Sequence, residues 1–273
     1  MKSKVFSKII KYATGMLFTI SVMGFSSQSV DAKIYQTDNS ISIINSSKHN
    51  LDIDSVKPLA PNQVLKTRIK DLVYRRDISK HLPNLAKNTP KIRKFTPKKL
   101  QKYNLLGCVW EKPDKISYHY VNLTKAQKKM ANDEIKRVNK LKLFHLVKSS
   151  SNKANITIQT QRVGNDGRFG VTTGNYYNGK GAKGLYFFYQ EHIHLDDDTM
   201  EKFTTKSMYK VLFRHTILHE LGHALGLAHL TSPADEPMIM YPSTTKLMLT
   251  GKNKKPIIDR KYINSLSVLY KNY

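Results

Sequence analysis

Five residues within eleven positions have the types and spacing of a catalytic metal site. His219 and His223 lie four positions apart, so on a helix they share one face and can bind the same metal ion. Glu220 follows the first histidine directly and is placed to hold a metal-bound water instead of the metal itself. Gly226 can end the helix in a left-handed turn, which would bring His229 back as a third ligand. Three nitrogen ligands with one open coordination position are typical of a catalytic zinc.

The alternative interpretation is an ordinary amphipathic helix that contains several histidines. The pattern His-Glu-x-x-His occurs by chance often enough to allow it. The longer motif from 219 to 229 also contains the glycine and the third histidine, and it is far more specific. His215 lies on the same face one turn earlier and is expected to pack beneath the site instead of binding metal. We therefore favour the metal site.

A second motif follows the third histidine. Residues 237–242 read Pro-Met-Ile-Met-Tyr-Pro. With the histidine motif, they resemble the metzincin clan of zinc endopeptidases, and the order Met-Tyr-Pro is similar to its matrixin branch, peptidase family M10. The resemblance implies that Met240 forms the Met-turn beneath the zinc. It also implies that Tyr241 and Pro242 help to wall the pocket for the P1′ side chain of the substrate.

The resemblance implies an α+β fold for a catalytic domain at residues 108–273. Such a domain has a twisted, mostly parallel sheet, a long metal-binding helix, the Met-turn and a C-terminal helix. The residue patterns agree with this order of elements. Strands are expected at 116–121, 156–160, 185–189 and 192–195, and helices at 125–141, at 206–228 and from 259 onward.

The implied activity is hydrolysis of internal peptide bonds by a zinc metalloendopeptidase. Glu220 would be the general base for a zinc-activated water, and the substrate would be a protein or peptide. The substrate is expected to lie extended against an edge strand within residues 169–177.

The first 32 residues have the pattern of a signal peptide. Four lysines precede an apolar stretch from 13 to 25, which is shorter than the roughly 20 residues of a membrane span. Short side chains at Val30-Asp31-Ala32 predict cleavage after Ala32; an uncleaved N-terminal anchor is the alternative. Both interpretations predict a secreted protein, extracellular or associated with the cell surface.

The chain is strongly basic, with 46 Lys and Arg against 20 Asp and Glu and a formal net charge of +26. Removal of residues 1–32 takes away four lysines and one aspartate, which leaves +23. We expect an exported monomer with this charge to bind anionic cell-wall polymers or a membrane surface, and not nucleic acid. The alternative to the enzyme is a basic polyanion-binding protein with an idle zinc site. The presence of Glu220 beside all three histidines favours the enzyme.

Residues 33–107 are predicted to form a basic, flexible pro-region or linker, because they contain five prolines and little regular patterning. A helix is expected there only at 65–78. Cys108 is the only cysteine in the chain. We favour a buried structural cysteine; the alternative is a thiolate that caps the zinc, as in animal matrixins.

The resemblance also bears on further ions. Asp196 and Asp198 lie in an acidic run similar to one that helps to hold calcium in the family, so Ca²⁺ is a second candidate cofactor; Thr199 stands where the family has a further carboxylate. His194 aligns with a ligand of the structural zinc of animal matrixins, but its upstream His and Asp partners are missing, so one zinc is expected. Lys261 and Tyr262 replace an acidic pair that fixes the mature N-terminus in the family.

Overall fold

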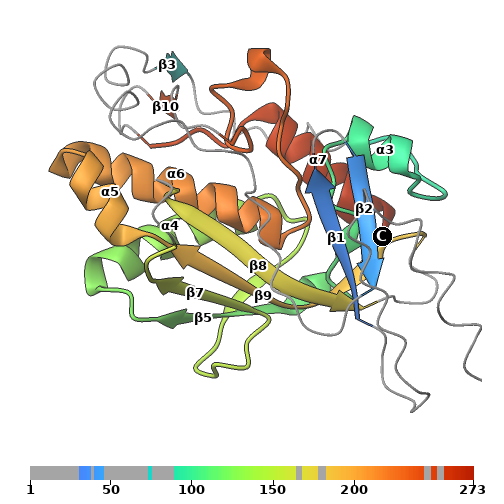
Figure 1. Ribbon diagram of the computed structural model, residues 1–273, viewed down its shortest axis with the longest axis horizontal. Coiled ribbons are helices and arrows are strands. Elements are labelled where there is room, and N and C mark those ends of the chain that lie inside the picture. Colours follow the sequence, from blue (N-terminus) through green and yellow to red (C-terminus); the bar gives the residue numbers. More distant parts are fainter. Residues whose placement is uncertain are drawn as a thin grey trace, which may run out of the picture.

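A twisted sheet lies beneath the helix that carries the histidine motif (Figure 1). The computed structural model describes residues 31–37, 40–45, 73–75, 89–163, 168–177, 183–242, 247–250 and 255–273. Its strands are β1 (Asp31–Thr37), β2 (Ser40–Asn45), β3 (Val73–Arg75), β4 (Cys108–Val109), β5 (Ile116–Val121), β6 (Leu146–Lys148), β7 (Ile156–Thr160), β8 (Gly170–Tyr177), β9 (Tyr186–Leu195) and β10 (Met248–Thr250). Its helices are α3 (Pro97–Lys102), α4 (Lys125–Asn139), α5 (Asp197–Phe203), α6 (Lys206–Ala224) and α7 (Arg260–Asn272), with 3₁₀ turns η3 (Pro113–Lys115) and η4 (Pro233–Asp235).

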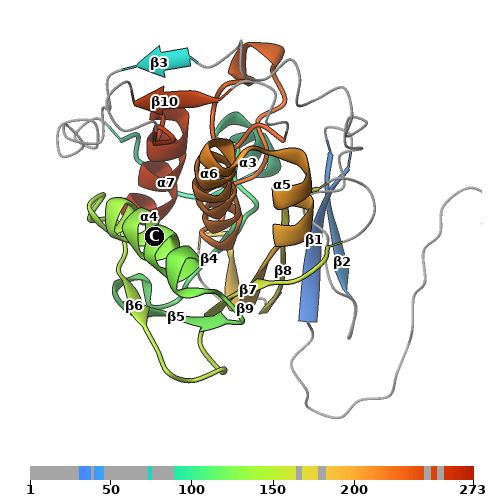
Figure 2. The ribbon, with the colours of Figure 1, turned by 90° about the vertical axis from the view of Figure 1, so that its left-hand side faces the viewer.

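The main sheet has the strand order β2-β1-β8-β9-β7-β5-β6, and β4 pairs with the beginning of β9. Strands β6, β5, β7 and β9 run parallel, whereas β8 is antiparallel to β9 and β1 is antiparallel to β8. Figure 2 shows α4, α6 and α7 on the same face of this sheet. The arrangement confirms the expected α+β architecture with a mostly parallel sheet and a C-terminal helix.

Local sequence signals explain several of these elements. In β5 the side chains alternate between buried and half-buried, as expected for a strand with one face on the core. At the start of α4, Thr124 and Gln127 form a capping box, in which each side chain accepts a hydrogen bond from the other's backbone N–H. Asp259 caps α7, with its Oδ1 2.9 Å from the backbone nitrogen of Tyr262. These strand and helix starts match the sequence predictions.

Other expectations were wrong in their bounds. The two strands expected at 185–189 and 192–195 are one continuous strand, β9, because it pairs along its length with β4, β7 and β8. The metal-site helix ends at Ala224 instead of 228, where Gly226 takes a left-handed φ of 97°. Of the helix expected at 65–78, residues 73–75 form strand β3 through pairing with β10, and the rest lies outside the described residues.

The packed structure begins before the expected domain start at 108. Within residues 89–107, the side chains of Ile92, Phe95, Leu100 and Leu105 are buried in the main core. The backbone of this segment also bonds to the site, because Leu106 donates to Gly226 and Ala228 donates to Asn104, both at 2.8 Å. The part of the predicted linker at 89–107 is therefore structural. The role of the pro-region upstream of it stays a prediction.

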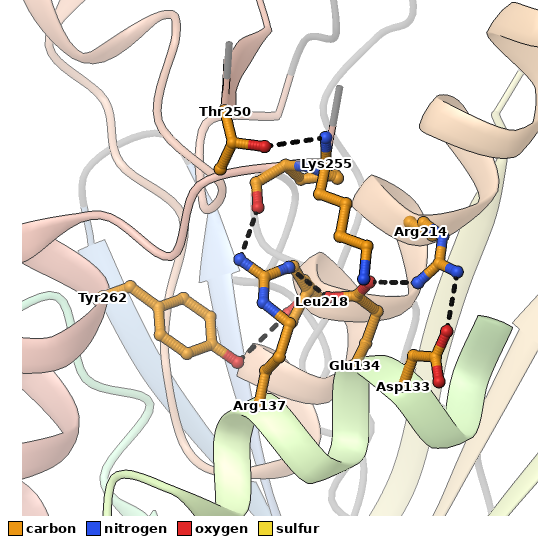
Figure 3. A network of polar contacts seen from close by, with 9 residues as sticks. Asp133, Glu134, Arg137, Arg214, Leu218, Thr250, Lys255 and Tyr262 are labelled. Atoms are coloured by element: carbon orange, nitrogen blue, oxygen red, sulfur yellow. Dashed lines mark hydrogen bonds and ion pairs between the residues drawn. The ribbon is translucent and has the colours of Figure 1, made fainter. Parts of the chain in front are cut away.

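A buried ionic network joins α4 to α6 and to the segment before α7 (Figure 3). The carboxylate of Glu134 is fully buried and pairs with Arg214 at 2.6 Å and with Arg137. Arg214 also reaches Asp133 at 2.9 Å, and the hydrogen bond from Arg214 lowers the pKa of that carboxyl. Arg137 donates to the carbonyl oxygen of Pro256 at 2.7 Å. The network links the metal-site helix to α4, which lies beside it on the sheet (Figure 2).

Among the residues that the structure describes, no helix is both long enough and apolar enough to cross a membrane.

Candidate metal centre

The end of α6 and the turn after it carry the three histidines of the motif. His219 and His223 lie one turn apart on α6, and His229 follows the turn at Gly226. A Cβ at Gly226 would lie 2.6 Å from the carbonyl oxygen of Cys108, so the turn needs glycine for space as well as for its φ. Trp110 donates from Nε1 to the carbonyl oxygen of Ala224 at 2.8 Å and so satisfies one of the last carbonyls of the helix.

The three imidazoles converge through their Nε2 atoms. Each pair among His219, His223 and His229 has an Nε2–Nε2 distance of 3.1 Å. His219 Nδ1 lies 2.6 Å from the carbonyl oxygen of Ile239, and His223 Nδ1 lies 2.8 Å from that of Leu227. Because a carbonyl only accepts, each Nδ1 carries the proton, and in a neutral ring Nε2 then presents a lone pair. The Nε2 lone pairs of His219 and His223 face each other at 3.1 Å and would repel, so a cation between them would stabilise the arrangement.

The triangle fits zinc. Ligand nitrogens at about 2.0–2.1 Å from a tetrahedral zinc are about 3.3 Å apart, close to the separation in this site. All three rings are buried, and within the described part of the chain they form the only group of three or more metal-binding side chains close enough to share an ion. His215 is buried and stacks on His219, with ring centroids 6.4 Å apart, and it does not join the group.

The Met-turn motif packs directly against the helix. Met240 is buried, and a Cβ at Gly222 would lie 2.3 Å from its sulfur, so this glycine allows the turn to approach α6. The backbone of Leu230, the residue after the third histidine, donates to the carbonyl oxygen of Met240 at 2.9 Å. Tyr241 and Pro242 follow and are half-buried. The two motifs predicted from sequence thus meet in the structure.

Asp259 supports this turn, a role that sequence reasoning did not assign to it. Its Oδ2 accepts from the backbone N–H of Ile239 at 2.9 Å, while Oδ1 caps α7. Burial raises the pKa of the Asp259 carboxyl, and four backbone hydrogen bonds oppose that shift. An aspartate just before a helix predicts the cap alone. The contact between Oδ2 and Ile239 depends on the tertiary fold, because it brings together residues 20 positions apart.

Glu220 is buried where α6 packs against strand β8. Its Oε2 lies 2.7 Å from the hydroxyl of Thr172, and a Cβ at Gly170 would lie 2.8 Å from its Oε1. The glycine therefore allows β8 to pass close to this carboxylate. From the sequence, Gly170 and Thr172 were expected to lie in a substrate-binding edge strand within 169–177, but nothing in the sequence singled out Thr172.

The two candidate calcium ligands are placed differently from each other. Asp196 is buried, and its two oxygens accept from the backbone nitrogens of Thr199 at 2.9 Å and Val163 at 3.0 Å, so it caps α5. Asp198 is exposed in the first turn of that helix. Calcium binding stays a prediction.

The histidines of β9 do not join the group of His219, His223 and His229, called the triad below, and they make polar contacts on the sheet. His194 lies within hydrogen-bond distance of Gln159 and Thr173, and His192 of Thr157. Burial, together with the neighbouring His192, lowers the pKa of His194 to about 4, and burial lowers the pKa of His192.

Cys108 and Lys261 also have defined environments. Cys108 is a buried free thiol in β4, and burial raises its pKa well above the ordinary value, as does the carboxyl of Glu191. This supports the structural interpretation over the zinc cap. Lys261 pairs with Asp235 of η4 at 2.5 Å, so the basic residue at this position ties α7 to the loop before the Met-turn.

Comparison with known proteins identifies the family. The profile of the matrixins, peptidase family M10, matches residues 109–270, which include the three histidines, Glu220 and the Met-turn. No curated protein matches the chain. The matched region spans more than half of the sequence and contains the convergent histidine site. The chain belongs to the matrixin family of zinc-dependent metallopeptidases.

Proposed function

We propose that this matrixin is a secreted zinc metalloendopeptidase that cleaves internal peptide bonds with Glu220 as general base. The observation that carries the proposal is the triangle of histidine nitrogens, in which His219 and His223 direct their Nδ1 protons to backbone carbonyls, next to a buried carboxylate. His219, His223 and His229 would hold the zinc. A zinc ion bound there supplies Lewis acidity, which polarises a carbonyl and lowers the pKa of water.

In the proposed reaction, Glu220 removes a proton from the attacking water and passes it to the leaving amine. The buried position of the carboxylate keeps it from being solvated by bulk water. Met240 packs against Gly222 of the helix, and its carbonyl oxygen accepts from the backbone N–H of Leu230, the residue after His229, so the Met-turn contacts the motif near both ends.

The substrate is proposed to bind along β8. This strand pairs with β9 on one side, and on its other side β1 pairs only with Tyr176 and Tyr177. The backbone of residues 170–175 is thus the part of β8 to which an extended peptide could add as a strand. Cleavage after Ala32 would also remove Asp31 and Ala32, the two residues through which β1 pairs with β8.

The test is cleavage of a peptide library by the mature protein, with and without a zinc chelator. The control is Glu220→Ala, in which zinc content and melting temperature should stay close to wild type, because Glu220 is not a ligand. Its turnover should fall by about 10²- to 10⁴-fold, and Glu220→Asp should lie between the two. A Glu220→Ala protein that cleaves at the wild-type rate would overturn the mechanism.

A surface-binding function is supported by a different observation. Between residues 89 and 110 there is no acidic residue. The apolar side chains of Ile92, Phe95 and Leu100 anchor the segment in the core, while most of its basic side chains point outward. These basic residues are Lys91, Arg93, Lys94, Lys98, Lys99 and Lys102. We propose that this basic segment attaches the exported, monomeric enzyme to anionic cell-wall polymers or anionic headgroups.

The attachment can be tested by a salt wash and a charge swap. At ~1 M salt the electrostatic reach falls to about 3 Å, so the protein should leave cell walls while still cleaving a small neutral peptide. Lys98→Glu with Lys102→Glu should weaken binding to cell walls and to anionic vesicles more than Lys125→Glu with Lys153→Glu, an equal charge change elsewhere. Equal losses in the two double variants would argue against a role for the basic segment.

A further inference from the structure

The side chain of Thr172 contacts the proposed catalytic base. Thr172 lies on β8 and is fully buried, and its Oγ1 is 2.7 Å from Oε2 of Glu220. The same oxygen is 3.1 Å from the backbone carbonyl oxygen of Glu220. An ionised carboxylate has no proton to donate, so the threonine hydroxyl is the donor. Its single hydrogen goes to the nearer, charged acceptor, because hydrogen bonds to ionised groups are the stronger ones.

The strand passes close to both oxygens of the carboxylate. Gly170 and Thr172 are two positions apart, so they face the same side of β8. A Cβ at position 170 would lie 2.8 Å from Oε1 and 3.1 Å from Cγ of Glu220, which shows how closely the backbone passes. One carboxylate oxygen is therefore engaged by the Thr172 hydroxyl, while the other lies beside the bare backbone of Gly170.

We infer that Thr172 is a positioning residue for Glu220. Its hydrogen bond holds Oε2, so that Oε1 is the atom that receives the proton from water. Without the hydroxyl, the carboxylate would lose the contact that sets its rotamer, and the buried base would sample orientations that do not reach the water. A misplaced catalytic group lowers the rate of the chemical step more than it changes substrate binding. This role rests on the proposed peptidase function.

The experiment compares Thr172→Val, which has nearly the same shape but no hydroxyl, with Thr172→Ser, which keeps the hydroxyl. A hydrogen bond to a charged group corresponds to about 10- to 100-fold in rate, so kcat of Thr172→Val should fall by that factor. KM, zinc affinity measured by chelator competition, and melting temperature should stay near wild type. Thr172→Ser should recover kcat to within a few-fold.

Thr157 offers a matched control. It lies on β7 and is also a buried threonine, and its hydroxyl lies 2.7 Å from a side-chain atom, Nδ1 of His192 on β9. Thr157→Val should leave kcat unchanged. Thr172→Val could also lower the melting temperature or the zinc affinity. In that case Thr172→Ser distinguishes a structural role from a positioning role. A Thr172→Ser protein with restored stability but a kcat that is still low would overturn the positioning role.

The outcomes separate this inference from the proposed function. Zinc-dependent cleavage by the wild type, together with an unchanged kcat in Thr172→Val, would overturn the role of Thr172 and leave the peptidase function standing. Absence of cleavage by the zinc-loaded wild type would overturn both.

Discussion

The carboxylate of Asp259 accepts a hydrogen bond from the backbone N–H of Ile239 at 2.9 Å, across 20 residues of sequence. The carbonyl of the same residue, Ile239, accepts from Nδ1 of His219 at 2.6 Å. Asp259 is thus connected to one of the three convergent histidines through one residue of the Met-turn. Partners of this kind fix the tautomer and orientation of a ligand, although this one acts through the backbone.

Replacing Asp259 should therefore weaken zinc binding as well as stability. Asp259→Ser keeps an acceptor for the N-cap of α7 but is too short to reach Ile239, so it should bind zinc about 10-fold more weakly and lose about 1–3 kcal/mol, because the buried N–H of Ile239 is left unpaired. Asp259→Ala should lose in addition about 1 kcal/mol for the cap. Chelator competition and urea unfolding measure the two effects. Unchanged zinc affinity in both variants would show that the turn holds its position without Asp259.

Zinc content should depend directly on the triad. Wild-type protein is expected to retain about one equivalent of zinc after dialysis, and His223→Ala should lose it, because catalytic zinc sites need three protein ligands. His215→Ala is the matched control, since His215 is buried on the same helix but lies outside the triad. Metal analysis of the dialysed proteins checks this. Zinc retained by the His223→Ala protein would mean that the ligands are assigned wrongly.

Stability should depend strongly on Glu134 and little on its exposed neighbours. Glu134→Ala leaves Arg137 and Arg214 without their shared buried carboxylate, and removal of one partner of a buried pair costs about 3–5 kcal/mol. Lys129→Ala removes a pair with Asp133 in which the lysine side chain is 77% exposed and the separation is 3.7 Å, and should cost less than about 1 kcal/mol. Urea unfolding of both variants tests the contrast, and similar losses would contradict it.

Glu191 should make stability fall as pH rises. It is buried beneath β8, where a Cβ at Gly174 would lie 1.9 Å from its Oε1, and burial raises the pKa of its carboxyl well above the ordinary value. In the unfolded chain this carboxyl titrates near its ordinary pKa, about 4.3. Between the two pKa values the native protein holds a proton that the unfolded chain has lost, so the free energy of unfolding decreases with increasing pH.

The variant Glu191→Gln, which stays neutral, should remove this slope. The melting temperature of the variant minus that of wild type should increase as the pH is raised above about 4.3, with both proteins measured at the same zinc concentration. Glu111→Gln alters an exposed glutamate, so its melting temperature should change with pH in parallel with that of wild type. Parallel curves for Glu191→Gln and wild type would mean that Glu191 is ionised in the folded protein.

The sequence by itself determined the local parts of the site. His219, Glu220 and His223 are related by the helix period, which is the same in any helix, and Gly226 marks the turn because only glycine adopts its φ of 97° without strain. The starts of α4 and α7 were likewise predictable, because Thr124 and Asp259 bond to backbone groups three residues away. These interactions depend on residues close together in the chain.

Only the tertiary structure decided which distant groups support that site. Thr172 meets Glu220 across 48 residues, and the segment at 104–106 bonds to the turn at 226–228 across more than 100. The continuity of β9 depends in the same way on three partner strands. A threonine in a strand looks the same in sequence whether it faces solvent or a buried carboxylate. The difference arises from how the sheet packs against α6, and no local pattern encodes that packing.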